Sequence, residues 1–316
     1  MYWRDEKTWQ YAAPVMLVLL PWLGSAGQIW GWILEMALIL AVLWVGQGRG
    51  VLVTAVLLTL GYLAAVLSFP GRSLTEIGYV PWAALVTVWG WKSHWPAKDN
   101  FFWSLVAAGI LAAVPLLAVT GNIRPGAVQE LINAMMKQYQ EAGQLAALQQ
   151  QGLAEADVRR LLEEVVSFVA LVFPGLVALA GLTEYGVAYY LATRLSVGQA
   201  ARVPFSRWRL PWYAVWGVIL ALLLYLAGDQ LARPALRVLG INLMLVYGAI
   251  ALVLGAAVYV YFLLSPRIPR LLKWGLILTN LLFVAFSVIS VLLFGLFDLV
   301  LNFRRLPEAG TGDPEG

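Results

Sequence analysis

Long apolar runs, separated by short connectors containing glycine, proline or charged residues, dominate this chain of 316 residues. A membrane-spanning helix needs about 20 predominantly apolar residues, because each residue adds about 1.5 Å to the crossing. Nine runs come near or exceed this length, with eight to ten allowed: 11–24, 28–46, 50–69, 75–91, 101–120, 164–193, 211–228, 239–264 and 269–301. The pattern predicts an all-α, polytopic membrane helix bundle.

The composition supports the same class. Hydrophobic residues make up 61% of the chain and charged residues only 12%, whereas about a quarter of the residues in a soluble domain are charged. So few charges could not cover a water-facing surface, which excludes an ordinary soluble enzyme. The 15 Trp and 13 Tyr are typical of membrane proteins, whose interfaces favour amphipathic rings.

We expect a single membrane domain over residues 1–305, followed by a flexible C-terminal tail at 306–316. The first apolar run is short enough to be re-entrant. We expect it to be retained rather than cleaved as a signal peptide, because residues 1–10 carry acids as well as bases.

The segment 124–160 is the one sizeable polar interval, and it carries an apolar stripe at helical spacing. The members of the stripe are Val128, Leu131, Ile132, Met135, Met136 and Tyr139. This spacing predicts an amphipathic extramembrane helix. Two roles are open for it: a helix that lies on the bilayer or covers a site, and a connector packed on the bundle.

The distribution of Lys and Arg favours a cytoplasmic N-terminus, because cytoplasmic connectors of membrane proteins are enriched in these residues. With that orientation, the basic stretch 202–209 also lies in the cytoplasm. A chain with nine spans places Arg304 and Arg305 on the opposite side, against the rule. We therefore expect a multi-pass protein of the plasma or inner membrane whose C-terminal side stays open.

Few of the residues that carry catalysis are present. The chain has no Cys and a single His, His94, in a short polar stretch. Serine-hydrolase, zinc-peptidase and nucleotide-binding loop motifs are missing from the sequence. We expect no catalytic residues, no metal site and no cofactor. The net charge of +4 is too small to indicate nucleic-acid binding in so apolar a chain.

Two acids stand out because an ionisable group inside hydrocarbon is costly and needs a partner, a cavity or a ligand. Glu35 lies near the middle of the second run, and Glu184 lies within the sixth beside Tyr185 and Tyr189. No Lys or Arg falls near the middle of any run. Each acid is either neutral and hydrogen-bonded to a neighbouring helix, or it meets a cation or an amine. In the second case all four residues are candidate ligand-binding residues.

The ninth run carries a line of polar residues. At 100° per residue, Asn280, Ser287 and Asp298 point within about 20° of one direction, and Asn302 points about 40° away. Such a line either holds helices together through hydrogen bonds or forms one wall of a polar cavity. We therefore add Asn280, Ser287 and Asp298 to the candidate ligand-binding residues.

Several short motifs carry a family resemblance. They are Gly240-Ile241-Asn242-Leu243, Arg267-Ile268-Pro269-Arg270, the run 295–304, and Arg194-Leu195 followed by Pro204-Phe205, Trp208, Leu210 and Pro211. Together with the order of the apolar runs, they resemble the YybS-like family of bacterial membrane proteins, a domain of unknown function. The motif positions of interest are Asn242, Pro211, Asp298 and Arg304. The chain departs from the family pattern where Asn302 replaces an acid and Leu254-Gly255 replaces Gln-Gly.

The YybS-like family is similar at fold level to the substrate-binding membrane subunits of energy-coupling factor transporters. This resemblance implies binding of a small molecule and ATPase and coupling subunits supplied in trans. Acids and aromatic rings without basic residues favour a cationic or amine-bearing ligand. The alternative function is a non-transporting membrane scaffold for cell-envelope or division machinery. The expected partners are therefore the lipid bilayer, a small-molecule ligand and those subunits, and not nucleic acid.

Overall fold

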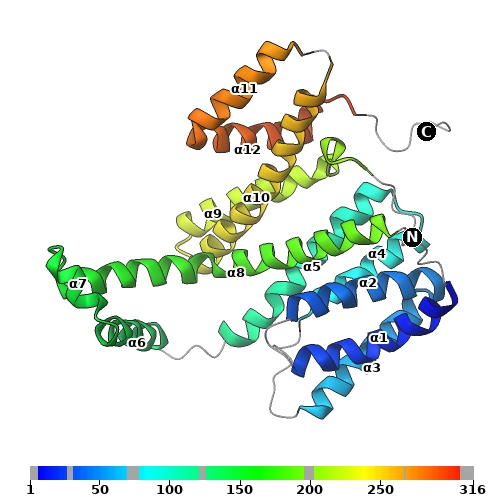
Figure 1. Ribbon diagram of the computed structural model, residues 1–316, viewed down its shortest axis with the longest axis horizontal. Coiled ribbons are helices and arrows are strands. Elements are labelled where there is room, and N and C mark those ends of the chain that lie inside the picture. The colour runs from blue at the N-terminus through cyan, green and yellow to red at the C-terminus, as the bar shows by residue number, and fades with distance from the viewer. Residues whose placement is uncertain are drawn as a thin grey trace.

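The structure of the protein is a computed structural model that describes residues 6–26, 31–69, 78–120, 126–195, 203–266 and 268–306. The predicted tail therefore lies, except for Leu306, outside the described residues. Within them every regular element is a helix (Figure 1). The α-helices are α1 (Glu6–Ala26), α2 (Gly31–Arg49), α3 (Val51–Ser68), α4 (Ala83–Lys92), α5 (Ala97–Thr120), α6 (Ala127–Glu141), α7 (Gln144–Gln150), α8 (Glu155–Arg194), α9 (Val215–Gln230), α10 (Pro234–Leu264), α11 (Arg270–Leu282) and α12 (Val284–Leu301); short 3-10 turns cover Val80–Trp82, Phe205–Arg207 and Trp212–Ala214.

The predicted polytopic helical membrane class is confirmed. Six helical segments of the described chain are long and apolar enough to cross a membrane: Gly31–Arg49, Val51–Ser68, Glu155–Arg194, Trp212–Gln230, Pro234–Leu264 and Val284–Leu301. The nine predicted spans are not all confirmed. Helix α4 has 10 residues and α11 has 13, and at about 1.5 Å per residue neither alone crosses a core of about 30 Å.

The main core lies among α1, α2, α3, α4, α5 and the C-terminal part of α8, which run side by side (Figure 1). Small residues let α5 and α8 approach closely. A Cβ atom on Gly181 would lie 2.4 Å from the Cβ of Ala112, and Ala188 and Ala192 are buried on the same part of α8. Glycine is therefore required at position 181 for this helix contact.

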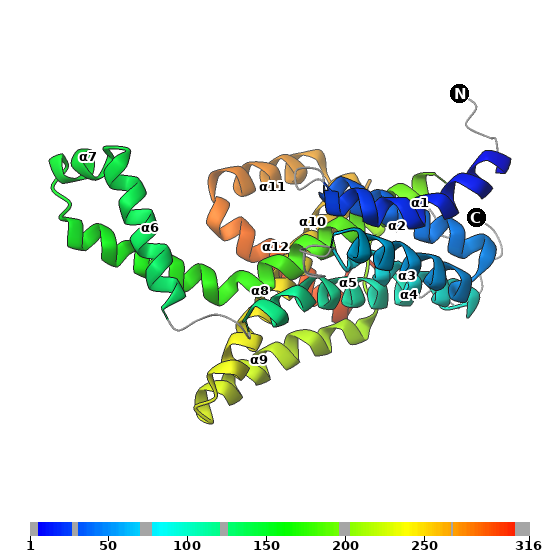
Figure 2. The same ribbon diagram turned by 90° about the horizontal axis from the view of Figure 1, so that it is seen from below.

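Helix α8 extends far beyond the bundle. Its 40 residues give a length of about 60 Å, about twice the hydrocarbon thickness. Helices α6 and α7 pack against its first turns and form an arm that projects from the bundle (Figure 2). The arm has a small core of its own: Ile132, Met136, Leu145, Val158 and Leu162.

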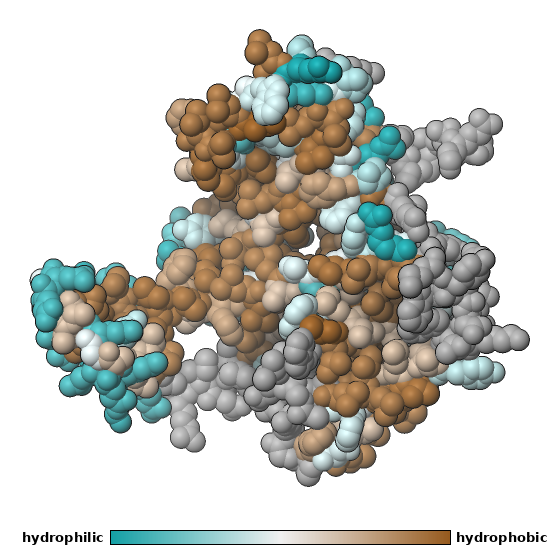
Figure 3. All heavy atoms as spheres, in the orientation of Figure 1, coloured by the Kyte–Doolittle hydropathy of each residue, from teal (hydrophilic) through white to brown (hydrophobic). Residues whose placement is uncertain are grey.

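The amphipathic helix predicted within 124–160 is present as α6. Its buried face packs into the arm, against α7 and α8, so the expectation of a connector packed on the bundle is not met. Figure 3 shows polar side chains over the arm and apolar ones over most of the remaining visible surface. This contrast agrees with an arm in water and a bundle in lipid.

In the C-terminal part, α10 packs against both α9 and α12. Helices α10 and α12 cross at two glycines. A Cβ atom on Gly255 would lie 1.8 Å from the carbonyl oxygen of Val291, and one on Gly295 would lie 1.9 Å from that of Ala251. No other residue fits at these positions without separating the two helices.

The predicted ninth span, 269–301, is not one helix. It divides at Phe283 into α11 and α12, which form a helical hairpin (Figure 1). Both ends of the hairpin lie at the C-terminal end of α10, because the Tyr261 hydroxyl donates a hydrogen bond to the Arg304 carbonyl at 3.2 Å. The chain after α12 therefore returns to the side on which α10 ends.

The hairpin predicts that the C-terminus and the basic connector 203–209 lie on one side of the membrane, which we expect to be the cytoplasm. This placement removes the conflict that Arg304 raises with the distribution of basic residues. Green fluorescent protein fused after residue 306 should fluoresce, and alkaline phosphatase fused there should be inactive. The same pair inserted after Gln150, in the arm, should give the opposite result. The same reporter result at both positions would contradict the hairpin, and the reverse pattern would contradict only the cytoplasmic assignment.

Candidate functional site

The two acids that the sequence singles out meet in space. Glu35 lies in the second turn of α2, nearer the helix end than predicted, and Glu184 lies in the C-terminal part of α8. Their carboxyl groups lie close enough to interact directly with each other. Two helices thus bring two carboxyl groups together as a pair.

Backbone and aromatic groups surround Glu35. The backbone N–H of Gly78 donates to its carboxyl group, and a Cβ atom at Gly78 would lie 1.8 Å from Glu35 Oε1. Only glycine at position 78 therefore allows this approach. The hydroxyl of Tyr62 on α3 donates to the Gly78 carbonyl. The Tyr62 ring centroid lies 6.5 Å from that of Tyr79 and 5.5 Å from that of Trp82.

The carboxyl pair has unused hydrogen-bonding capacity. Glu184 Oε1 is buried and receives no hydrogen bond from the described residues. The ion pairs observed among those residues lie elsewhere in the fold. No group of three or more His, Asp or Glu that could hold a metal occurs in the described part of the chain. The pair therefore suits a proton or a monovalent cation better than a metal that needs several ligands.

Tyr185 and Tyr189, the predicted neighbours of Glu184, point elsewhere. Tyr185 is fully buried, and its hydroxyl is hydrogen-bonded to Thr87 on α4. Tyr189 stacks on Tyr185 and packs against Phe101, with ring centroids 6.3 and 4.8 Å apart. Their role in ligand binding stays a prediction, and the position of Tyr185 supports a structural role.

A buried polar network that the sequence reasoning missed joins α4, α5 and α8. Thr87 Oγ1 lies 2.7 Å from Ser104 Oγ, which donates to the Asn100 carbonyl at 2.7 Å. The Asn100 amide donates to the Thr87 carbonyl at 3.0 Å. The spacing of Asn100 and Ser104, one helical turn apart in an apolar run, is a signal that could have located it.

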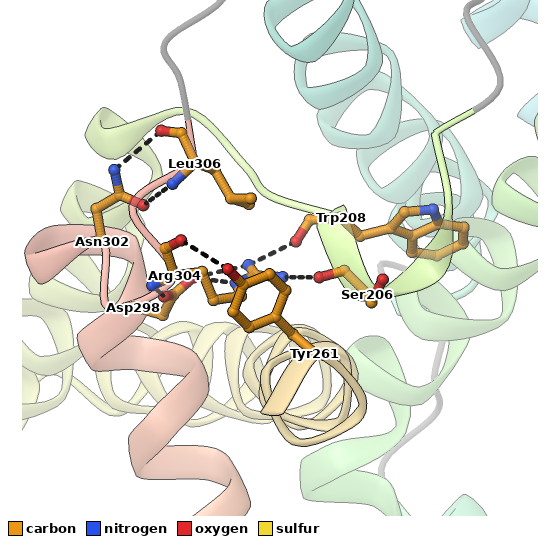
Figure 4. Close-up of polar contacts among 7 residues, drawn as sticks. All are labelled: Ser206, Trp208, Tyr261, Asp298, Asn302, Arg304 and Leu306. Atoms are coloured by element: carbon orange, nitrogen blue, oxygen red, sulfur yellow. Dashed lines mark hydrogen bonds and ion pairs between the residues drawn. The ribbon is translucent and has the colours of Figure 1, made fainter. Parts of the chain in front are cut away.

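Asp298 lies in a second polar cluster, at the C-terminal end of α12 (Figure 4). Arg304 Nη2 lies 2.7 Å from Asp298 Oδ2, and the two side chains are 1% and 3% exposed. The same guanidinium group donates to the carbonyls of Ser206 and Trp208, each at 2.7 Å. The cluster thus ties the end of α12 to the connector before α9.

The turn that makes this ion pair is local. Asn302 ends α12 in the left-handed conformation, with φ of 47°, which Asn tolerates better than most residues. Its side chain accepts a hydrogen bond from the Leu306 N–H at 3.0 Å and donates to the Leu306 carbonyl at 3.1 Å. Asn302 therefore reverses the chain so that Arg304 returns to Asp298.

The predicted polar line of the ninth run is divided by the break at Phe283. Ser287 donates to the Asn280 carbonyl at 3.1 Å and so bridges the break, while Asp298 is paired with Arg304. These contacts favour helix-to-helix bonding over a polar cavity wall. Asn280 alone among the three borders a cleft, which has a volume of about 420 Å³ between α10, α11 and α12.

Asn242 on α10 supports α8 next to Pro174. Its Oδ1 accepts from the Gly175 N–H at 2.6 Å, and its Nδ2 donates to the Leu171 carbonyl at 2.8 Å. These two backbone groups pair with each other in a regular α-helix. Asn242 thus satisfies the backbone of α8 beside its internal proline.

A family model matches residues 15–299. The chain belongs to the family described as "Predicted membrane protein (DUF2232)". The match includes Glu35, Glu184, Asn242 and Asp298 and ends before Arg304. No curated protein and no solved structure matches this chain. The resemblance to the YybS-like family and to coupling-factor transporter subunits stays an expectation.

Within this DUF2232 protein, the four positions singled out by family resemblance have structural contacts. Asn242 supports α8, and Asp298 and Arg304 form the buried ion pair. Pro211 precedes the turn Trp212–Ala214, which leads into α9. Each of these four residues contributes to the packing of the C-terminal half, and they lie apart from the carboxyl pair.

Proposed function

We propose that this protein binds a small cationic or amine-bearing molecule at the carboxyl pair Glu35 and Glu184. The contact between two carboxyl groups from separate membrane helices is the observation that carries the proposal. A cation that enters between them offsets the cost of holding acids in hydrocarbon. Tyr62, Tyr79 and Trp82 add aromatic faces that attract cations.

The proposal is tested with full-length protein in detergent and three probes: benzylammonium, phenethylammonium and neutral benzyl alcohol. The two amines should raise the melting temperature and the alcohol should not. A ligand at 100 times its Kd stabilises a protein by about 2.7 kcal/mol, which is a shift of several degrees for a chain of this size. Glu35→Gln and Glu184→Gln should each remove the shift.

Glu164→Gln is the matched control, because Glu164 is on the same helix as Glu184 but pairs with Arg160 in an exposed position. It should keep the full response to the amines. Size-exclusion profiles show whether each variant folds. An amine response that survives both Gln variants, or equal responses to amine and alcohol, would exclude the pair as the binding site. No response to any probe, together with an unchanged melting temperature in Glu184→Gln, would also overturn the proposal.

A substrate-capture role further implies ATPase and coupling subunits supplied in trans, in the plasma or inner membrane. A scaffold for cell-envelope or division machinery is the alternative, and the projecting arm with its own core favours a surface for protein partners. Crosslinking in native membranes discriminates the two. Crosslinks to an ATPase complex support capture, and crosslinks from the arm to envelope-assembly proteins support the scaffold.

A further inference from the structure

The cleft beside α11 is apolar over most of its wall. Tyr259 and Leu263 of α10, Leu276 and Asn280 of α11, and Val291 of α12 line it. Its volume of about 420 Å³ lies in the range of small-ligand sites, about 300–1,000 Å³. The outer face of α11 is also apolar and exposed, so this helix stands in lipid rather than in a protein core.

One end of the cleft is basic. Lys273 lies one turn before Leu276, on the face of α11 that also carries Asn280, and these three residues are half-buried while their neighbours are exposed. Arg270 begins α11 and precedes Lys273 by three residues, and the sequence has no Asp or Glu between Asp229 and Asp298. The positive charge at this end therefore has no acid nearby along the chain.

The basic end also carries a residue that is typical of a membrane interface. Trp274, next to Lys273, is 69% exposed, and exposed Trp side chains concentrate at the level of lipid headgroups. An apolar cleft that opens towards a basic, Trp-bearing end matches a molecule with an apolar chain and an anionic head. Basic residues at such a level attract anionic lipids.

We propose that the cleft between α10, α11 and α12 binds one anionic phospholipid, with an acyl chain along the cleft and its phosphate beside Lys273. Charge complementarity commits the site to an anionic lipid, since a zwitterionic lipid carries no net charge for the basic end to attract. The site is separate from the carboxyl pair and does not depend on it.

The chain has no Cys, so a single reporter can be introduced without a background reaction. Ile277→Cys places a bimane fluorophore in the cleft, and Leu222→Cys on α9 is the matched control; Ile277 is 43% exposed and Leu222 47% exposed. The labelled full-length proteins are reconstituted in phosphatidylcholine bilayers that contain brominated phosphatidylglycerol or brominated phosphatidylcholine. Bromine quenches bimane on contact, so the mole fraction of brominated lipid that gives half of the maximal quenching reports the affinity for that lipid.

At position 277, phosphatidylglycerol should quench at about a fivefold lower mole fraction than phosphatidylcholine, the effect of one basic residue on an anionic lipid. At position 222 the two lipids should quench equally. Lys273→Gln should abolish the preference at 277, and Lys273→Arg should keep it. Ala256→Trp, which fills the cleft wall, should reduce quenching by both lipids at 277 only.

Equal quenching by both lipids at 277 in the otherwise unchanged protein would overturn the proposal. So would a preference that survives Lys273→Gln. If Lys273→Gln fails to fold, the double variant Lys273→Arg with Arg270→Gln takes its place. This variant keeps a positive charge at position 273 and removes the one at position 270. An unchanged preference for phosphatidylglycerol in it assigns the headgroup contact to position 273. A preference lost with Arg270→Gln alone would place the phosphate at Arg270, the first residue of α11, and contradict the assignment.

Discussion

Replacing Arg304 with Met will lower the free energy of unfolding by about 3–5 kcal/mol. The substitution leaves the Asp298 carboxylate buried without its counter-ion, and an uncompensated buried charge costs about that much. It also removes the donors to the carbonyls of Ser206 and Trp208. The loss is measured as the change in unfolding free energy in detergent, with a denaturant titration.

Neighbouring substitutions separate charge burial from general disturbance. Arg305→Gln is the matched control, because Arg305 is the exposed next residue, and it should change stability by less than about 0.5 kcal/mol. The double variant Asp298→Leu with Arg304→Met removes both charges and should recover part of the loss. It should not recover all of it, because Ser206 and Trp208 still lack donors. A loss below about 1 kcal/mol in Arg304→Met would place the pair in water.

Replacing Asn242 with Leu will lower the free energy of unfolding by about 2–6 kcal/mol. Leu has nearly the same size but leaves the Gly175 N–H and the Leu171 carbonyl without the partners that Asn242 supplies, at about 1–3 kcal/mol for each unsatisfied buried group. Pro174, the residue before Gly175, has no N–H of its own and weakens the helix at the same place. The change is followed by denaturant titration and by protease cleavage of α8.

Two glycines of α8 give a matched test of the same contact. A Cβ atom on Gly175 would lie 2.8 Å from Asn242 Oδ1, whereas one on Gly186 would meet nothing within 4 Å. Gly175→Ala should therefore destabilise the protein, and Gly186→Ala should be neutral or stabilise by up to about 1 kcal/mol through helix propensity. If Asn242→Leu costs under about 1 kcal/mol, α8 closes its own hydrogen bond and needs no support from α10.

The candidate site could be found only in part from the sequence. Glu35 and Glu184 are conspicuous because each is an acid in an apolar run, but nothing along the chain says that they meet. Their contact depends on how α2 packs against α8. The hydrogen bond from Asn242 to the backbone of Gly175 is equally distant in sequence. Such contacts leave no local pattern in the sequence, because the identity of one residue does not specify which distant residue it contacts.

The break at Phe283 could not be predicted from the sequence for a different reason. The sequence around it is apolar and has no Gly or Pro to mark a turn, so helical periodicity predicts one continuous run. The observed break follows from tertiary packing, because α12 must bring Gly295 against Ala251 on α10. The angles calculated for Asn280, Ser287 and Asp298 assumed an unbroken helix, and therefore did not predict their separate partners.

The sequence by itself determined the class of the protein: apolar runs of membrane length and a very low charge content permit only a helical membrane bundle, because backbone groups in lipid must bond within each helix. It also determined the amphipathic helix and the two isolated acids. Tertiary structure alone decided that the acids form a pair, that the last run is a hairpin, and that Arg304 neutralises Asp298. The physical reason is that membrane insertion depends on the composition of each segment, whereas pairing between helices depends on side-chain shape and hydrogen bonds at their contacts.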